Sequence, residues 1–511
     1  MDIAPVSKLP IVDLAIDTLR INKQALIFVN AKRSAQKAAL DIAKVSKNHI
    51  DNKEELAKLA EQLLKAVTYP TEQCKKLSEA VSCGVAFHHA GLAGKQKTLI
   101  EDAFRAGTLK LIASTPTLAA GLDMPAFRAI IKDLKRFANW GMQFIPVLEY
   151  KQMAGRAGRP GKEDYGEAII LAASLEDAAK LRDTYIHGDV ESIYSKLAVE
   201  PVLRTYVLSL VATGLCRSKS DLITFFSKSF WAHQYKDMPQ IERIIERVVD
   251  MLKEYTFISG TAKKRSLEFE TADSLAGNDV LQATALGVRV SQLYIDPLSA
   301  NKLLTALQKE ELTVFGTLHA FCSTLEMRPL LRVKARESEE YNTVLFTNES
   351  QLLVPMPTMY DPEYEEFFDA IKTTSFFSDW VNEIGEDSLL KKYDIRPGEI
   401  NAKVDNMDWL LYCAYELVPL VGLKQHQRSI NKLRKRVKYG VKEELLQLLQ
   451  LKQVGKIRSR KLVTAGYATL ADVRTAPLGI LQKICGEKIA ISIKEQLGVS
   501  TESSGSLTEF L

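Results

Sequence analysis

Short apolar runs alternate with helix-like stretches through the first two hundred residues, and this alternation constrains the fold more than any other feature. The run ALIFVN at residues 25–30 precedes a helix-like stretch from Ala31 to about Lys47. Strands that alternate with helices predict a parallel α/β sheet, in which ligands gather at the carboxyl ends of the strands. Further strand-to-loop transitions occur in GVAFHHAGL from Gly84, KLIASTPTLAAGLDMPA from Lys110 and EAIILA from Glu167.

A second feature is the run QMAGRAGRPG, from Gln152 to Gly161. It places Arg156 and Arg159 three residues apart among glycines, which is typical of arginine fingers. A fixed guanidinium fork stabilises charge on a transferring phosphate better than a lysine does. The alternative is a glycine-rich loop whose arginines are simply solvated.

Bulk properties exclude several classes of protein. The 511 residues suggest three or four domains, and a net charge of +5 restricts any nucleic-acid surface to local patches. There is no apolar run long enough to span a bilayer and no signal-peptide layout, so we expect a cytoplasmic protein without a membrane partner. The six cysteines lack CxxC spacing, which argues against a metal site or a disulfide framework.

Four motifs together resemble a known motor domain. FVNAKRSA, FHHAGL, ASTPTLAAGLDMPA and QMAGRAGRPG follow the order and spacing of the second RecA-like domain of Ski-like superfamily-two helicases. Within that group the chain is most similar to the archaeal fork-repair DNA helicases, relatives of the helicase part of DNA polymerase theta. The resemblance implies that residues 1–189 form one RecA-like motor domain, with ATP as the cofactor.

The resemblance also assigns roles to residues. It would place Arg156 and Arg159 on the ATP γ-phosphate, with Gln152 beside them. Gly121 and Asp123 would lie near the nucleotide, although the family often has Asn at the second position. Further residues would follow the nucleic-acid backbone: Asn30, His88, His89, Ser114 and Thr115.

Two of these motifs have competing interpretations. His88 and His89 follow a predicted strand and could be packed and hydrogen bonded instead of contacting DNA. GLAGKQKT, from Gly91, invites a phosphate-loop interpretation, but the GxxxxGK[ST] motif requires glycine where His89 stands and a hydroxyl where Gln96 stands. We therefore reject that interpretation.

The first motor domain of such helicases carries the phosphate loop and the acidic box that binds Mg²⁺. The 511 residues contain neither motif, and they begin with Met1 and a helix-like stretch from Leu9 to Arg20 that normally precedes the second domain. We expect one product of a split helicase or a truncated reading frame. The Mg²⁺ ligands would lie on a separate polypeptide, and this chain alone should not hydrolyse ATP.

Residues 129–147, AIIKDLKRFANWGMQFIPV, form two extended runs around an Asn- and Gly-containing turn, which predicts a hairpin. In the resembling family a hairpin at this place separates the duplex, and its aromatic side chain stacks on the last base pair. Phe137 and Trp140 are the candidates. The alternative is a structural hairpin whose aromatics pack on a neighbouring domain.

The remaining residues predict an all-α continuation with one small sheet. We expect a winged-helix domain at 190–280, with FISG and LEFETA as its strand pair and bracing as its main role. A helical ratchet bundle would follow at 281–437. Its long helix, from Gly398, would carry Lys403 and Trp409 beside single-stranded DNA, although Ala402 stands where the family commonly has arginine. A tryptophan at helical spacing can equally be a core residue.

The basic run KLRKRVK, at 432–438, leads into a sequence that resembles a helix-hairpin-helix domain at 438–498. Such hairpins present backbone amides to a DNA phosphate and bind independently of base identity. Gln453 replaces the first glycine of the usual pair. The candidate contacts are Gly455, Arg458, Arg460 and Lys461.

The tail at 499–511 is polar and Ser-rich, which predicts a flexible segment. Its last residues resemble a sliding-clamp-binding peptide through Leu507, Phe510 and Leu511, although Ser504 occupies the usual Gln position. The alternative is an inert tail.

These features predict the C-terminal part or subunit of an ATP-dependent 3′–5′ DNA helicase that acts on single-stranded and forked DNA. It would need a separate polypeptide with the first RecA-like domain. Two alternatives stay open: a Ski-like RNA helicase, and a non-catalytic DNA-binding subunit. The helix-hairpin-helix resemblance favours DNA, and retention of all four motor motifs favours an enzyme.

Overall fold

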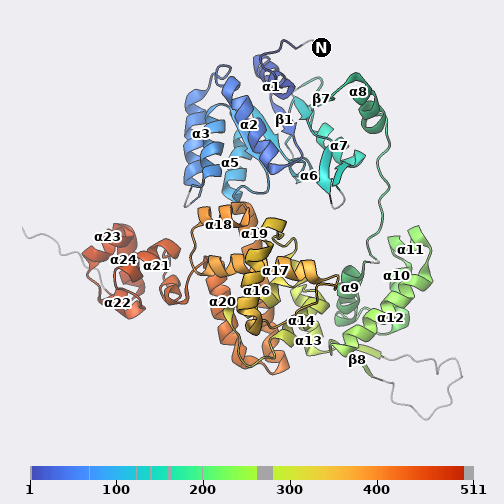
Figure 1. Ribbon diagram of the computed structural model, residues 1–511, viewed down its shortest axis with the longest axis vertical. Coiled ribbons are helices and arrows are strands. Elements are labelled where there is room, and N and C mark those ends of the chain that lie inside the picture. The colour runs from blue at the N-terminus through green and yellow to red at the C-terminus, as the bar shows by residue number, and fades with distance from the viewer. Residues whose placement is uncertain are drawn as a thin grey trace, which may run out of the picture. The chain divides into compact units, whose positions relative to one another are not determined.

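The computed structural model describes residues 3–67, 70–121, 124–138, 141–158, 161, 163–197, 199–261 and 280–499. The chain forms two compact units (Figure 1). Unit 1 comprises Met1–Ile193 together with the short segment Asp394–Asn401, and unit 2 comprises Tyr194–Tyr393 and Ala402–Leu511. Among the helices in these ranges, none has the length and apolar character that a bilayer crossing requires.

Unit 1 is built on a five-stranded parallel sheet with the strand order β2-β3-β1-β4-β7. The predicted parallel α/β sheet is therefore confirmed. All residues of the first four strands in the sequence are buried, and this burial explains their continuous apolar runs. The strands are β1 (Ala25–Phe28), β2 (Val85–His88), β3 (Leu111–Ser114), β4 (Arg128–Ile131) and β7 (Glu167–Ile170).

Helices connect these strands (Figure 1). The expected helices at 9–20 and 31–47 are present as α1 and α2, each within one residue of the predicted ends. The helices of unit 1 are α1 (Pro10–Arg20), α2 (Lys32–Ser46), α3 (Lys53–Lys65), α4 (Glu72–Ser82), α5 (Gly94–Arg105), α6 (Thr117–Gly121), α7 (Val147–Ala154), α8 (Leu175–Leu181) and the π-helical turn η1 (Arg182–Ile186).

A buried arginine fastens α1 to the sheet. The fully buried guanidinium of Arg128 donates hydrogen bonds to Asp17 Oδ2 at 3.0 Å, Thr18 Oγ1 at 2.9 Å and Glu167 Oε2 at 2.7 Å. A buried charge is tolerated only when it is paired and hydrogen bonded. These bonds therefore fix α1, β4 and β7 relative to one another.

The predicted hairpin is shorter than the range 129–147. Strands β5 (Lys135–Ala138) and β6 (Gly141–Phe144) pair antiparallel, with Phe137 opposite Met142. Residues 129–131 lie in β4 of the parallel sheet, because this apolar run is buried on both faces. At the other end, Val147 already belongs to α7.

Unit 2 begins with helices followed by a two-stranded antiparallel sheet. The expected helix SDLITFFSKSFWAH is divided in two, because Ser229 leaves the helical conformation and caps the next helix. The strand FISG pairs with Val280–Ala283, whereas the expected partner LEFETA lies outside the described residues. The elements are α9 (Glu200–Ala212), α10 (Lys219–Ser227), α11 (Phe230–Tyr235), α12 (Met238–Glu254), β8 (Ile258–Thr261) and β9 (Val280–Ala283).

The following residues are helical as far as Gln496. Towards the C-terminus a separate small core gathers around Leu448, Leu462 and Leu481. The helices before it are α13 (Ala285–Leu293), α14 (Pro297–Ala306), α15 (Val314–Cys322), α16 (Ser338–Asn348), α17 (Tyr364–Val381), α18 (Glu386–Tyr393), α19 (Pro397–Leu417) and α20 (Gln427–Tyr439). The helices around it are α21 (Lys456–Thr464), α22 (Leu470–Thr475), α23 (Leu478–Cys485) and α24 (Glu487–Gln496).

Candidate functional site

Arg156 follows directly after α7 and is held by backbone groups of neighbouring segments. Its Nε donates to the carbonyl oxygen of Ala119 in α6 at 3.1 Å, and its Nη2 donates to the same oxygen. Its own carbonyl accepts from the amide of Ala126 at 2.8 Å, and Gly158 donates to the carbonyl of Ala126 at 2.7 Å. The loop with Arg156 is thus bonded to the segments on both sides of Gly121, which ends α6. Arg159 and Asp123 lie outside the described residues.

The glycines of this loop have a steric role. Gly158 has a φ of +89°, a conformation that favours glycine. A Cβ on Gly166 would lie 2.1 Å from the amide nitrogen of Gly158, so the two backbone segments pass too close for a side chain. This close approach sets the path of the loop that leads on from Arg156.

Helix α7, which carries the exposed Gln152 one turn before Arg156, is capped by a distant carboxylate. Glu191 accepts from the amide of Val147 at 2.6 Å and from that of Leu148 at 3.1 Å. These bonds hold the pKa of the Glu191 carboxyl below its ordinary value. Sequence reasoning missed Glu191, because nothing in the local sequence shows that a residue so far along the chain returns to this helix.

The two histidines at the carboxyl end of β2, His88 as its last residue and His89 directly after it, are packed inside unit 1. His88 Nε2 is 2.9 Å from Glu101 Oε1, and the amide of Gly91 donates to His89 Nδ1 at 3.1 Å. Burial lowers the pKa of both imidazoles, that of His89 to about 4. Their side chains are only 6% and 1% exposed. The contact of His88 and His89 with a nucleic-acid backbone stays a prediction, with the packed arrangement as its alternative.

Asn30, Ser114 and Thr115 lie at the carboxyl ends of β1 and β3, as predicted from the strand pattern. Ser114 is fully buried, and Thr115 Oγ1 lies 2.9 Å from Thr117 Oγ1. Asn30 is half-buried and donates to the carbonyl of Lys135 at 2.9 Å. The structure thus gathers these residues at one edge of the sheet, but it leaves Asn30 as the most accessible of the three.

The hairpin β5–β6 presents apolar side chains to solvent. Met142 and Phe144 are 58% and 54% exposed, and Lys135 Nζ lies 4.5 Å from the centre of the Phe144 ring. The backbone of Phe137 is paired in β5, while Trp140 lies outside the described residues. The predicted stacking by these two aromatics stays a prediction.

The expected ratchet helix coincides with α19. Trp409 is half-buried on it, and Lys403 Nζ donates to the carbonyl of Pro329 at 2.6 Å. The ammonium group of Lys403 therefore has a role inside unit 2. The predicted contacts of these two residues with single-stranded DNA stay predictions.

The residues expected to form the turn of the helix-hairpin-helix lie directly before α21. Gln453 has a φ of +66°, which is a left-handed conformation that favours glycine, and Gly455 is the N-cap of α21. The helix-hairpin-helix domain stays a prediction. Arg458 Nη1 donates to the Gln453 carbonyl at 2.9 Å and braces this hairpin. Lys461 is exposed on α21.

Arg460 is paired with acidic side chains. Its guanidinium forms a two-pronged pair with Glu383, at 2.7 and 2.8 Å, and a bond of 2.7 Å to Glu444. The bonds with Glu383 raise the pKa of Arg460. The contact of Arg460 with a DNA phosphate stays a prediction. In the basic run before it, Lys432 pairs with Glu443 and Arg434 with Asp408.

The residues expected near ATP fit a phosphate group in chemistry, since they contribute a guanidinium at Arg156 and an exposed amide at Gln152. Within the described ranges, no group of three or more His, Cys, Asp or Glu side chains could hold a metal ion. The residues of the clamp-like tail, Leu507, Phe510 and Leu511, lie outside those ranges.

Comparisons with known proteins agree with this organisation. The family model "Helicase conserved C-terminal domain" matches residues 58–161, and "Archaeal helicase, domain 4" matches residues 315–440.

Similar relatives are the ATP-dependent DNA helicases Hel308 of three archaea. The protein of Methanocella arvoryzae is 39% identical over 97% of this chain and 66% of its own length. Those of Methanococcus vannielii and Pyrococcus abyssi are 36% and 37% identical over 97% and 95% of this chain, and 68% and 66% of their own lengths. The chain thus spans about two thirds of the length of these curated relatives.

Proposed function

Because the chain belongs to the Hel308 family of archaeal helicases, we propose that it carries the second motor domain and the DNA-gripping parts of an ATP-dependent DNA helicase. The enzyme would move 3′ to 5′ on single-stranded DNA and unwind forked or branched DNA. The observation that carries the proposal is the fixed position of Arg156, whose guanidinium donates to the Ala119 carbonyl of α6 and whose backbone is bonded to Ala126.

Bound ATP, with Mg²⁺, supplies the phosphoanhydride whose cleavage drives such a motor. The part of Arg156 is to place a delocalised positive charge where negative charge develops on the transferring phosphoryl group. Its loop has little freedom, because the Ala119 carbonyl holds the side chain and Ala126 bonds the backbone on both sides. Arg159 and Gln152 would act beside it.

ATP hydrolysis also requires a phosphate loop and an acidic box, which the 511 residues do not contain. We propose that a first RecA-like domain can supply both in trans and complete the nucleotide pocket. The Mg²⁺ ligands would come from that domain.

The other parts would grip DNA. The hairpin β5–β6 would separate the strands, α19 would follow the single strand, and the helices from Gly455 onward would bind phosphates without regard to sequence. The helices α9–α12 with the sheet β8–β9 would form the winged-helix brace. The similar relatives are ATP-dependent DNA helicases, which favours DNA over RNA as the substrate.

The test mixes purified chain with a purified first RecA-like domain of a Hel308 relative. We expect DNA-stimulated ATP hydrolysis from the mixture only, and stronger stimulation by single-stranded DNA than by RNA. Arg156→Ala should lower the turnover number by about 10³-fold or more. Lys180→Ala is the matched control, because its only described ion pair is the exposed one with Glu176.

Three outcomes would contradict the proposal. Unchanged turnover in the Arg156→Ala mixture would remove the finger assignment. ATP hydrolysis by the purified chain alone would remove the need for a composite pocket. A mixture that binds DNA but never hydrolyses ATP would favour the non-catalytic alternative.

A further inference from the structure

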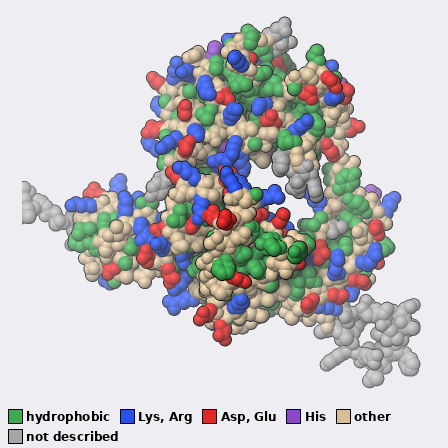
Figure 2. All heavy atoms as spheres, viewed as in Figure 1, with side chains coloured by type: hydrophobic (Ala, Val, Ile, Leu, Met, Phe, Trp, Pro, Cys, Tyr) green, Lys and Arg blue, Asp and Glu red, His purple; other side chains and the backbone are tan. Residues whose placement is uncertain are grey.

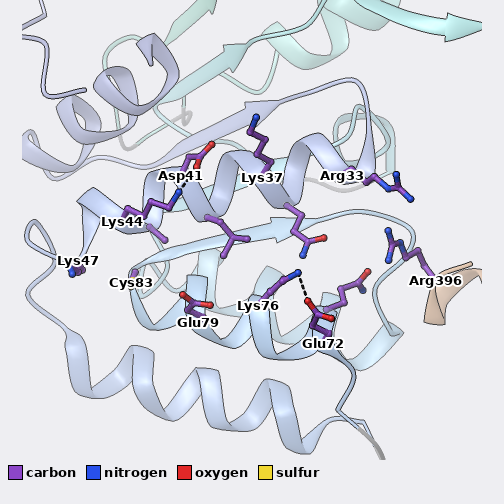
Figure 3. A pocket seen from close by; sticks show the side chains of 14 residues that line it. Arg33, Lys37, Asp41, Lys44, Lys47, Glu72, Lys76, Glu79, Cys83 and Arg396 are labelled. Atoms are coloured by element: carbon purple, nitrogen blue, oxygen red, sulfur yellow. Dashed lines mark hydrogen bonds and ion pairs between the residues drawn. The ribbon is translucent and has the colours of Figure 1, made fainter. Parts of the chain in front are cut away.

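A groove in unit 1, lined by none of the predicted contact residues, runs between α2 and α4 and has a volume of about 740 Å³. Figure 3 shows that mainly basic side chains of α2 line one wall, that Glu72, Lys76 and Glu79 of α4 line the other, and that Arg396 lies at one end close to Arg33. All of these residues belong to unit 1. None of them was assigned a role by the motifs of the sequence.

Basic residues follow one side of α2 along the groove. Arg33, Lys37, Lys44 and Lys47 are separated by four, seven and three positions, and this spacing keeps them on the same side of the helix. At 1.5 Å per residue the row is about 21 Å long. That length corresponds to roughly six phosphates of one DNA strand at 3.4 Å spacing. Lys and Arg side chains are also visible over α2 in Figure 2.

The acidic residues of the groove do not cancel this charge. Asp41 pairs with Lys44 at 2.9 Å, and Glu72 pairs with Lys76 at 2.6 Å. Among the described residues, Lys37, Lys47 and Arg396 have no ion-pair partner, and one further acid, Glu79, lines the groove. Arg33 binds Asp394 but its side chain is still 73% exposed. Positive charge is therefore in excess.

The lining defines the class of ligand. It contains no aromatic side chain on which a base or nucleotide ring could stack, and its walls are mainly charged and amide groups. A row of cations along an open groove suits a repeating anion better than a single compact one. Among cellular polymers, the phosphodiester backbone has this regular charge.

We propose that the groove between α2 and α4 binds the phosphate backbone of a DNA segment, without sequence preference and separately from the helix-hairpin-helix region. The inference rests on the proposed function, because it assumes that this chain acts on DNA. The groove begins beside the N-terminal end of α2, immediately after the carboxyl end of β1. It would therefore extend the DNA-binding surface from that edge of the sheet along the outside of the motor domain.

The test uses the full chain and a fluorescein-labelled forked DNA, with binding followed by anisotropy across a salt series. The double variant Lys37→Gln/Lys47→Gln should bind about tenfold more weakly near 0.1 M salt, and its log K against log[salt] slope should be smaller by about two. The matched control is Lys53→Gln/Lys58→Gln. It removes two exposed lysines of α3 that do not line the groove, and it should match the parent.

A second measurement needs no variant. Bound DNA should protect Lys37 and Lys47 from acetylation more strongly than Lys53 and Lys58. If the parent binds DNA but the groove variant matches the control, or if the four lysines are acetylated alike, the groove inference is overturned and the proposed function stands. If the parent chain binds no DNA at any salt concentration, the proposed function itself fails, and the groove inference fails with it.

Discussion

At the scale of single residues, burial decides what a polar side chain can do, and His89 shows this most clearly. It is 1% exposed, and its Nδ1 accepts from the Gly91 amide. Burial, followed by the nearby charge of Lys32, holds the pKa of His89 at about 4, against an ordinary value near 6.5. The imidazole is therefore neutral in the folded protein throughout the physiological range.

This neutral state predicts a pH dependence of stability. Between about pH 6.5 and pH 4 the unfolded chain binds a proton at His89 that the folded chain does not, so the folded state loses stability as the pH falls through this window. The loss from one histidine cannot exceed about 1.4 kcal/mol per pH unit. Urea unfolding between pH 7.5 and pH 4.5 should show a shallower pH dependence for His89→Gln than for the parent. Equal slopes would show that His89 binds its proton over the same pH range in the folded chain as in the unfolded chain.

At the scale of elements, two neighbouring basic residues of α21 have different surroundings. Arg460 is turned towards Glu383 and Glu444, whereas Lys461 is exposed. Arg460→Ala should lower the free energy of unfolding of unit 2 by roughly 1–3 kcal/mol, because it leaves the mostly buried Glu383 carboxylate without its ion-pair partner Arg460, with only the Lys442 amide still donating to it. Lys461→Ala should leave unfolding unchanged and weaken DNA binding, with a smaller salt slope.

The two variants serve as controls for each other, since each removes one positive charge from the same helix. Thermal unfolding and DNA-binding anisotropy are measured on both variants. We expect a loss of stability only for Arg460→Ala and weaker DNA binding for Lys461→Ala. If Arg460→Ala weakened DNA binding without any loss of stability, the guanidinium would be a phosphate contact after all, as the sequence had suggested.

The local sequence pattern was enough to predict the strands of the parallel sheet and the helices α1 and α2. The strands of the parallel sheet are continuous apolar runs, and α1 and α2 have the predicted ends within one residue. The hairpin predicted at residues 129–147 is present, but its predicted extent was too wide, since residues 129–131 belong to the central sheet. An apolar run alone does not show whether a strand joins a hairpin or the central sheet.

The site was predictable only where backbone geometry sets the residue type. Gly158 of the run QMAGRAGRPG has a positive φ, and so does Gln453, which stands at a usual glycine position. Partners brought in from far along the chain were not predictable. Glu191 lies 44 residues from the helix start that it caps, and Glu383 lies 77 residues from Arg460.

At the scale of the whole molecule, the chain contributes to unit 1 twice. The segment Asp394–Asn401 returns to it after two hundred residues of unit 2. Glu399 pairs with Lys32, Asp394 pairs with Arg33 at 2.7 Å, and the Gly398 amide donates to the Gly91 carbonyl at 3.2 Å. Unit 1 therefore includes residues that the predicted domain boundary at 189 leaves out.

Gly398 makes this return testable. A Cβ at this position would lie 2.1 Å from the carbonyl oxygen of Ala90 and 2.8 Å from that of Leu92, so the two backbones could not keep their present approach. Gly398→Ala should lower the stability of unit 1 by roughly 1–3 kcal/mol. Amide hydrogen exchange in the loop after β2 and at the start of α2 should become faster. Gly94→Ala is the control, because no atom lies within 4 Å of a Cβ there. If the Gly398 variant exchanged at the parent's rate, the segment would not be part of unit 1 in solution.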